Sequence, residues 1–506
     1  MAPSPSGLLL TWIVIQTLPT FSPAIAEALG VNWGRAASHP LPAETAVQIL
    51  KANGITKVKL LEADPEALES LSGSNIDVTV GIPDSMLRSL NSSLKAAQSW
   101  VHDNITRYFA EGSSRVRIQK RFGNGPLHIA NTCIHRYVLV GDEPFLETYG
   151  MEFYPFLVGA ATNIQTALAK ANFAKEIKVA IPCSFDAIQS ESGMPPRGNF
   201  RTDINETMVQ VLKFLSHHQS PLFVTISPFQ SYLQNKNVSL DAALFKENVG
   251  PSHVASKSSF ELIYETLESA LSSAGFPELD IIIGRIGWPT DGAANATPSN
   301  AEVFLKGLVE HLKGKSGNLP QSKKPPPQTY IMSLLDEDKR DVASGNFERH
   351  WGVFTFDGQA KYHVDFGQGS RKMVNGQNVH YLPSKWCVVN NNKDLSNATA
   401  QASYACSASD CSAMSRGGSC FDIGWPGNIS YAFNSYYQQN SQNADGCDFG
   451  GLGLITTVDP SVGTCRFFVQ LSTSVSVSLH TYDLLHWLAS PLVSILLWLL
   501  GGVDWE

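Results

Sequence analysis

The stretch Asp280-Ile-Ile-Ile-Gly-Arg-Ile-Gly-Trp-Pro289 decides how the rest of the chain is organised. A run of isoleucines leads into Gly284 and Arg285, and a Gly-Trp-Pro sequence ends the run. A short apolar run closed by glycine and proline is typical of a fully buried parallel strand. We therefore expect Arg285 to face a site at the carboxyl end of a barrel built from such strands.

A second stretch, His135-Arg-Tyr-Val-Leu-Val-Gly-Asp-Glu143, has the same form. Glu143 follows its apolar run at the position that Arg285 occupies in the first stretch. Because chemistry in barrels of parallel strands gathers at the carboxyl ends of the strands, this pair of residues determines what the protein can do.

Apolar strand-like runs alternate with amphipathic helix-like segments between residues 29 and 338. This alternation predicts a parallel sheet covered by helices, and eight repeats favour closure into a (β/α)₈ barrel. A doubly wound open sheet is the alternative, but no Gly-x-Gly-x-x-Gly turn opens the first helix. The expected strands are 29–34, 57–63, 77–83, 135–143, 178–184, 223–229, 280–289 and 330–338; the expected helices include 43–53, 94–110, 160–171, 207–217 and 260–274.

The ends of the expected strands are rich in carboxylates and tryptophan. This composition suits a sugar chain, because aromatic rings stack on pyranose faces and carboxylates bind hydroxyl groups. The alternative is that part of this set consists of ordinary surface residues of loops. The set is Trp33, Glu62, Asp84, Asp142, Glu143, Ser227, Arg285, Trp288, Glu337 and Arg340.

Both ends of the chain indicate targeting. An apolar core at residues 8–15 and Ala24-Ile-Ala26 predict a secretory signal peptide over residues 1–26, with a buried first helix as the alternative. Small residues at 472–478 precede an apolar run at 484–503. This order predicts an anchor signal at 471–506 that is exchanged for a glycolipid, with a plain membrane span as the alternative. We expect a secreted protein held at the outer face of the plasma membrane.

Six of the eight cysteines lie in the last third of the chain. In a secreted chain they predict a disulfide-rich domain at 385–470, after a polar linker at 367–384. Six cysteines allow many pairings, and a zinc site is the alternative, although no Cys-x-x-Cys pair is present. The six are Cys387, Cys406, Cys411, Cys420, Cys447 and Cys465.

Composition excludes several classes of partner. The net charge of -8 provides no basic footprint, so we expect no nucleic-acid partner. His39, His217 and His218 lack ligand partners at useful spacing, so we expect no metal site, and we expect no cofactor.

Several motifs occur in an order that is familiar from a known family. They are Gly30-Val-Asn-Trp-Gly-Arg35, Lys57-Val-Lys-Leu-Leu-Glu-Ala-Asp64, Val140-Gly-Asp-Glu-Pro-Phe145, Ile286-Gly-Trp-Pro-Thr290 and Asn346-Phe-Glu-Arg-His-Trp-Gly352. Together they resemble the plant glucan endo-1,3-β-glucosidases of glycoside hydrolase family 17, over residues 29 to about 366; we expect the barrel domain to span residues 27–366. The resemblance implies a β/α barrel, retaining hydrolysis of β-1,3-glucan and often a membrane anchor. The segments around Cys387, Cys406, 431–437 and 459–465 resemble carbohydrate-binding module family 43.

The resemblance also implies a pair of catalytic carboxylates, a general acid and a nucleophile. The acid corresponds to Glu143, but the nucleophile corresponds to Arg285. A guanidinium stays protonated and has no acceptor lone pair, so it cannot attack an anomeric carbon. We expect it also to lower the pKa of the nearby Glu143 and so to hinder proton donation.

Three other departures from the family pattern fall in the same site. Asp142 replaces an asparagine, Ser227 replaces a tyrosine and Arg340 replaces a lysine, while Glu337 and Glu348 match family acids. An Asp142–Arg285 ion pair would leave the site internally neutralised. The expected substrate-binding residues are Trp33, Glu62, Asp142, Ser227, Trp288, Glu337, Arg340 and Glu348.

The sequence is compatible with three functions. The first is an anchored protein that binds β-1,3-glucan (callose) and hydrolyses it weakly or not at all. The second is an active retaining endo-1,3-β-glucosidase in which Glu62, Asp142, Glu337 or Glu348 replaces the nucleophile, although each would need a shift of several ångströms. The third is a non-catalytic interaction protein of the wall.

Overall fold

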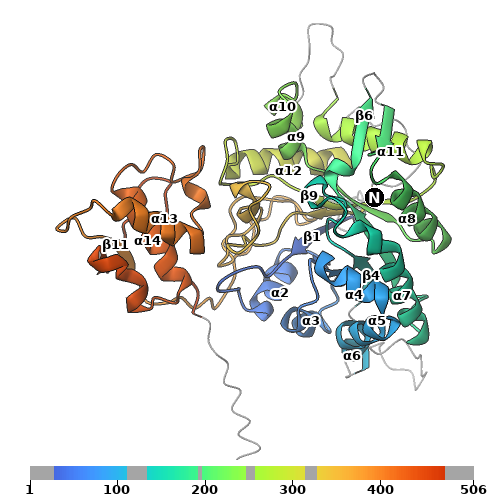
Figure 1. Cartoon of the computed structure of the whole chain (residues 1–506), viewed down its shortest axis with the longest axis horizontal. Coiled ribbons are helices and arrows are strands. Elements are labelled where there is room, and N and C mark those ends of the chain that lie inside the picture. Colours follow the sequence, from blue (N-terminus) through green and yellow to red (C-terminus); the bar gives the residue numbers. More distant parts are fainter. Residues whose placement is uncertain (1–27, 111–133, 192–196, 247–256, 314–326, 473–506) are drawn as a thin grey trace, which may run out of the picture. The chain divides into compact units, whose positions relative to one another are not determined.

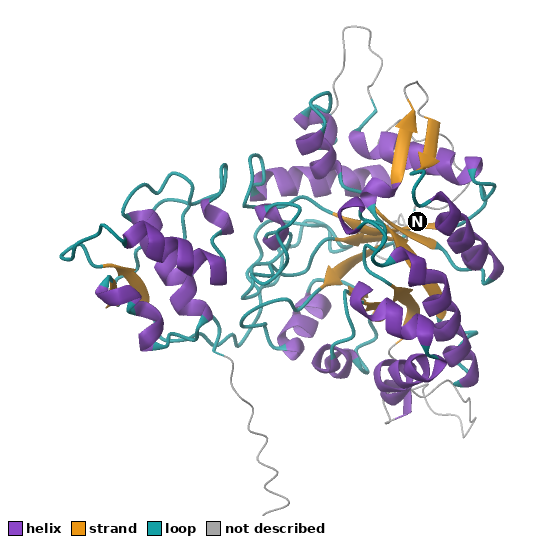
Figure 2. Cartoon of the chain, in the orientation of Figure 1, coloured by secondary structure: helices purple, strands orange, loops and turns teal. Residues whose placement is uncertain are grey.

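Eight parallel strands close into a barrel in the order β1-β10-β9-β8-β5-β4-β3-β2. The computed structural model describes residues 28–110, 134–191, 197–246, 257–313 and 327–472. Figure 2 shows the barrel strands among the helices that cover them. Each of the eight predicted stretches contains a strand, but the strands end before the predicted bounds, and Pro228 and Phe229 of the predicted strand 223–229 belong to a helix. The strands are β1 (Leu29–Trp33), β2 (Lys57–Leu60), β3 (Asp77–Ile82), β4 (Ile134–Val140), β5 (Lys178–Cys183), β8 (Leu222–Thr225), β9 (Ile281–Ile286) and β10 (Thr329–Ile331).

Amphipathic helices cover the barrel (Figure 1), and their buried faces are apolar. The predicted helices are confirmed, except that 94–110 divides into α5 (Leu94–Val101), a π-helical turn (His102–Thr106) and α6 (Arg107–Ala110). The others around the barrel are α2 (Ala43–Ala52), α3 (Pro65–Leu71), α4 (Leu87–Ser92), α7 (Leu157–Lys170), α8 (Asn205–His217), α9 (Pro228–Gln234), α10 (Leu240–Ala243), α11 (Ser259–Ser273) and α12 (Pro298–Leu312). A hairpin that the apolar pattern did not indicate, β6 (Ile188–Glu191) and β7 (Arg197–Phe200), follows β5.

The cysteine-rich part folds around its own core. Strands β11 (Trp386–Val389) and β12 (Gly453–Thr456) pair antiparallel, beside helices α13 (Ala398–Ala408) and α14 (Gly427–Gln439). The structure selects one pairing from those that the sequence left open: Cys387–Cys447, Cys406–Cys411 and Cys420–Cys465. In the core, the rings of Phe433 and Phe449 stack with centroids 3.8 Å apart.

The predicted linker is held against the barrel. The side-chain amide of Asn53 donates to the carbonyl of Val374 at 3.0 Å, and the amide of Val374 donates back to Asn53 at 2.8 Å. Segment 367–384 therefore does not act as a free tether over this part of its length.

The predicted signal peptide and residues 473–506 of the predicted anchor signal lie outside the described residues. Leu471 is described and is 2% exposed in the core cluster of the barrel, so the folded part runs one residue past the predicted boundary. Within the described ranges, no helix is long and apolar enough to cross a membrane.

Candidate active site

Arg285 and Glu143 meet at the carboxyl ends of β9 and β4, two strands that β8 and β5 separate in the barrel. The Nη1 atom of Arg285 lies 2.8 Å from Oε2 of Glu143, and its Nη2 atom donates to both carboxylate oxygens of Asp142. Arg285 is only 5% exposed. One buried guanidinium therefore pairs with two adjacent carboxylates, and the ion pair expected between Asp142 and Arg285 is present.

Burial and charge act in opposite directions on the two carboxylates. Burial raises the pKa of Asp142, but Arg285, Lys59 and Arg340 together bring it below its ordinary value. Burial also raises the pKa of Glu143, and here Arg285 does not outweigh it. The expectation that Arg285 leaves Glu143 with a lowered pKa is therefore wrong, because the low-dielectric surroundings disfavour its charged form more strongly.

Arg285 stays protonated and therefore positively charged. Burial works against the charged form, but the two carboxylates outweigh it and hold the pKa of Arg285 above its ordinary value. The site thus contains a permanent cation at the position where the resemblance places a nucleophile.

Asp84 fixes the turn that carries the two carboxylates. Its side chain accepts hydrogen bonds from the backbone amides of Asp142 at 2.9 Å and Glu143 at 3.2 Å. Burial and the neighbouring Asp142 raise the pKa of Asp84 to about 7, against these hydrogen bonds. The sequence placed Asp84 at a strand end, but only the fold shows this positioning role.

Asp84→Asn is expected to change how stability depends on pH. The folded-state pKa of about 7 lies above the ordinary value of 3.8, so the contribution of Asp84 to stability falls as pH rises through this interval. Asparagine does not titrate, so the unfolding free energy of the variant relative to the natural protein should improve from about pH 4 to about pH 7. Urea unfolding at several pH values measures this difference, and a difference that is constant with pH would contradict the prediction.

A second group of charges follows β10. The Nε atom of Arg340 lies 3.3 Å from Oε2 of Glu348, and its Nη1 atom lies 3.5 Å from Oε2 of Glu337. The indole of Trp351 also donates to Oε2 of Glu348 at 3.0 Å. Gly34 leaves room for this group, because a Cβ atom there would lie 2.1 Å from Oε1 of Glu337.

Lys59 is a site residue that the sequence reasoning missed. It lies buried on β2 and donates to Oδ1 of Asn32 at 2.9 Å, while the amide nitrogen of Asn32 donates to the carbonyl of Gly284, next to Arg285. Burial, and then Arg285, lower the pKa of Lys59 to about 7. The available signal was a lysine between two apolar residues of an expected strand, Val58-Lys-Leu60.

One cavity connects the two charged groups. Its lining includes Glu143, Ser227, Gln230, Arg285, Arg340, Glu348 and Trp351. Ser227 also caps α9, since its hydroxyl accepts from the amide of Gln230 at 3.3 Å. In the described part of the chain, no group of three or more His, Cys, Asp or Glu side chains is arranged to hold a metal ion.

Comparison with known proteins identifies the family of both folded parts. The family model "Glycosyl hydrolases family 17" matches residues 29–366, and the model "X8 domain" matches residues 385–454. The chain belongs to glycosyl hydrolase family 17. It carries an X8 domain after the family 17 barrel, and the resemblance inferred from the motifs is confirmed.

Two relatives that are named as glucan endo-1,3-beta-glucosidases match almost the whole chain. "Glucan endo-1,3-beta-glucosidase 9" of Arabidopsis thaliana is 57% identical over 480 residues, which are 94% of this chain and 95% of that protein. "Glucan endo-1,3-beta-D-glucosidase" of Olea europaea is 27% identical over 472 residues, 90% of this chain and 97% of that protein. The solved structure of CJP38, a beta-1,3-glucanase and allergen of Cryptomeria japonica pollen, aligns with a TM-score of 0.58 at 28% identity and covers 68% of this chain and 100% of that one.

Two of the expected substrate-binding residues are buried in the core. Trp33 is 2% exposed and Trp288 is fully buried, so neither offers a ring face to a sugar. Trp288 packs edge-on against Phe229 and donates its indole N–H to the carbonyl of Asn295 at 2.9 Å. Direct stacking by these tryptophans was therefore a wrong expectation for this family 17 barrel, because barrel closure places both rings in the core.

Glu62 lies close to other carboxylates of the site. Burial, and then Asp64, Glu337 and Asp142, raise the pKa of Glu62. Of the expected substrate-binding residues, Ser227, Arg340 and Glu348 line the cavity directly, while Asp142 and Glu337 bind the arginines at its wall.

Proposed function

We propose that this chain is a β-1,3-glucan-binding protein of glycosyl hydrolase family 17 in which hydrolysis is lost or strongly impaired. The 2.8 Å contact between Arg285 and Glu143 carries this proposal. The relatives that match most of the chain are named as glucan endo-1,3-beta-glucosidases, which supports β-1,3-glucan as the ligand.

The chemistry of a retaining glycosidase needs two carboxyl groups about 5 Å apart, one of which attacks the anomeric carbon. Arg285 occupies the position of the attacking group and has no lone pair to attack with. Its guanidinium also engages Glu143, the group that would protonate the leaving oxygen. Loss of an essential nucleophile typically lowers the rate by about 10⁴- to 10⁶-fold.

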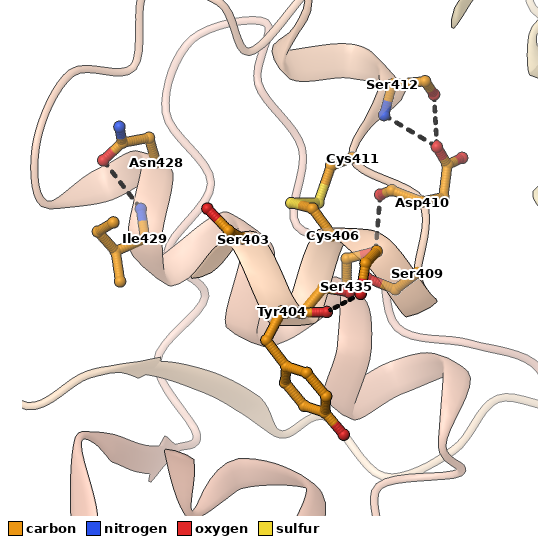
Figure 3. The surroundings of a disulfide bond; sticks show 12 residues. Ser403, Tyr404, Cys406, Ser409, Asp410, Cys411, Ser412, Asn428, Ile429 and Ser435 are labelled. Carbon is orange, nitrogen blue, oxygen red and sulfur yellow. Dashed lines mark hydrogen bonds between the residues drawn. A yellow bond between two sulfur atoms is a disulfide. The ribbon is translucent and has the colours of Figure 1, made fainter. Parts of the chain in front are cut away.

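Glucan binding, unlike hydrolysis, does not require a nucleophile. The cavity retains donors and acceptors suited to sugar hydroxyls on Ser227, Gln230, Arg340 and Glu348. The X8 domain adds exposed aromatic rings, among them Tyr404 at 56%, Phe421 at 50% and Trp425 at 62% exposure. In Figure 3, Tyr404 projects from its helix with its ring uncovered by the other residues drawn.

We also propose the division of the chain that the sequence suggests: a signal peptide at 1–26, the barrel at 27–366, a linker at 367–384, the X8 domain at 385–470 and an anchor signal at 471–506. This division supports a secreted protein that a glycolipid holds at the outer face of the plasma membrane, in contact with the wall. The small-x-small site before residue 27 and the apolar run at 484–503 support it.

The purified chain is expected to sediment with insoluble β-1,3-glucan yet to release no more reducing sugar from laminarin than its Glu143→Gln variant. The physical reason is the missing nucleophile, while the polar lining of the cavity remains intact. Cellulose provides the control for non-specific sedimentation. Binding to neither polysaccharide would favour a non-catalytic interaction protein of the wall.

An active endo-1,3-β-glucosidase is the second candidate, because the raised pKa of Glu143 suits a general acid and Glu348 lines the same cavity. Oε2 of Glu348, however, already accepts from both Arg340 and Trp351. Laminarin hydrolysis that both Glu143→Gln and Glu348→Gln abolish would establish this second function and overturn the first.

A further inference from the structure

In segment 348–351, the first and last residues line the cavity, and the two residues between them contact the X8 domain. Glu348, within the 3₁₀ turn Asn346–Arg349, and Trp351 line the cavity. Between them, Nη1 of Arg349 lies 3.0 Å from Oδ1 of Asp410, and Nε2 of His350 lies 2.7 Å from the hydroxyl of Ser412. The barrel and the X8 domain belong to the same compact unit of the structure.

Arg349 connects Asp410 to the charged group of the cavity. Its Nε atom donates to the backbone carbonyl of Arg340 at 3.1 Å. The side chain of Arg340 in turn pairs with Glu337 and Glu348. Asp410 is therefore connected to the cavity wall through two arginines, Arg349 and Arg340.

Asp410 is held in the X8 domain by hydrogen bonds to Ser412 and Ser435, which Figure 3 draws. It lies in the short loop that the Cys406–Cys411 disulfide closes. The backbone amide and the hydroxyl of Ser412 both donate to its Oδ1 atom, and the hydroxyl of Ser435 on α14 donates to its carbonyl at 2.7 Å. A carboxylate fixed in this way sets where the guanidinium of Arg349 lies.

The X8 domain also contacts the loop after β9, the strand of Arg285. The amide of Ser419 donates to Oδ1 of Asp291 at 2.7 Å, and the hydroxyl of Ser415 donates to the carbonyl of Gly292 at 2.8 Å. Gly417 adopts a φ of +85° here, and a Cβ atom on it would lie 2.6 Å from Ala294. The segments after β9 and β10, two of the strands whose carboxyl ends line the cavity, are thus both in contact with one domain.

We propose that the X8 domain braces the glucan site of the barrel, with Asp410 acting through Arg349 as a positioning residue for Glu348 and Arg340. For its binding readout this inference rests on the proposed function. Removal of the brace frees a turn that carries two residues of the cavity lining, so oligosaccharide bound in the barrel should be held less tightly.

The test compares Asp410→Ala and Asp410→Asn in the full chain with Asp422→Ala, an exposed carboxylate of the same domain. Amide hydrogen exchange in residues 346–351 should accelerate in Asp410→Ala, less in Asp410→Asn, and not in Asp422→Ala. Affinity for laminarihexaose should fall about fivefold in Asp410→Ala, within the range typical of coupled positions. In a Glu348→Ala background, Asp410→Ala should cause a smaller loss of affinity than it does in the natural chain, since part of its effect acts through Glu348.

If amide hydrogen exchange in residues 346–351 is no faster in Asp410→Ala than in Asp422→Ala, the proposed brace is wrong. Faster exchange with unchanged affinity would also overturn it, because the turn would then move without consequence for the site. If the natural chain binds no laminarihexaose, the proposed function fails by itself; faster exchange in Asp410→Ala would still support the brace, and unchanged exchange would overturn it.

Discussion

The double variant Arg285→Glu, Asp142→Asn is expected to hydrolyse laminarin at least about 10³-fold faster than the natural protein. Glutamate at position 285 supplies the missing nucleophile on β9, opposite Glu143. Asparagine at position 142 removes the charge that would otherwise repel the new carboxylate. Two carboxylates near each other, without the intervening cation, restore the arrangement of a retaining glycosidase.

The measurement is release of reducing sugar from laminarin, and two controls isolate the cause. Arg285→Gln, Asp142→Asn removes the same charges without supplying a nucleophile, so it should stay inactive. Addition of Glu143→Gln to the active variant should abolish the gain, since the general acid is then lost. If the double variant remains inactive while still binding laminarin, then Ser227 or Arg340 also prevents catalysis and Arg285 is not the deciding residue.

Arg285→Ala is expected to lower the free energy of unfolding by about 2 kcal/mol near neutral pH. The change leaves Asp142 and Glu143 at the barrel mouth without their shared cation, and it opens a space in a buried position. Breaking a fully buried ion pair typically costs more than this, but Asp142 keeps part of its surface in water, which screens the charge that is left behind.

The pH dependence of this loss has a defined sign. Arg285 helps to hold the folded-state pKa of Asp142 below its ordinary value, so the stabilisation is present above that value and disappears as pH falls through the folded-state pKa. The gap in melting temperature between the variant and the natural protein should therefore narrow in acid. The triple variant Arg285→Ala, Asp142→Asn, Glu143→Gln should recover most of the loss, because no unpaired charge remains. An unchanged melting temperature for Arg285→Ala at pH 7 would show that the ion pair contributes nothing.

The fold could be predicted from the sequence because strands buried on both faces are largely apolar, as β9 is apart from Arg285. The defect at position 285 could also be predicted, since permanent charge and the lack of a lone pair belong to arginine itself. The division into a barrel and a cysteine-rich domain followed from where the cysteines stand along the chain.

The tertiary structure alone decided how far each site group is removed from water and what lies beside it. Barrel closure buried Trp33 and Trp288, and it placed Lys59 among the charges of the site. It also made burial, rather than Arg285, the stronger influence on the pKa of Glu143. Likewise, only the packed chain shows that Arg349 turns away from the cavity to meet Asp410. Residue type is a local property that the sequence states outright, whereas burial and proximity arise only when distant segments pack together.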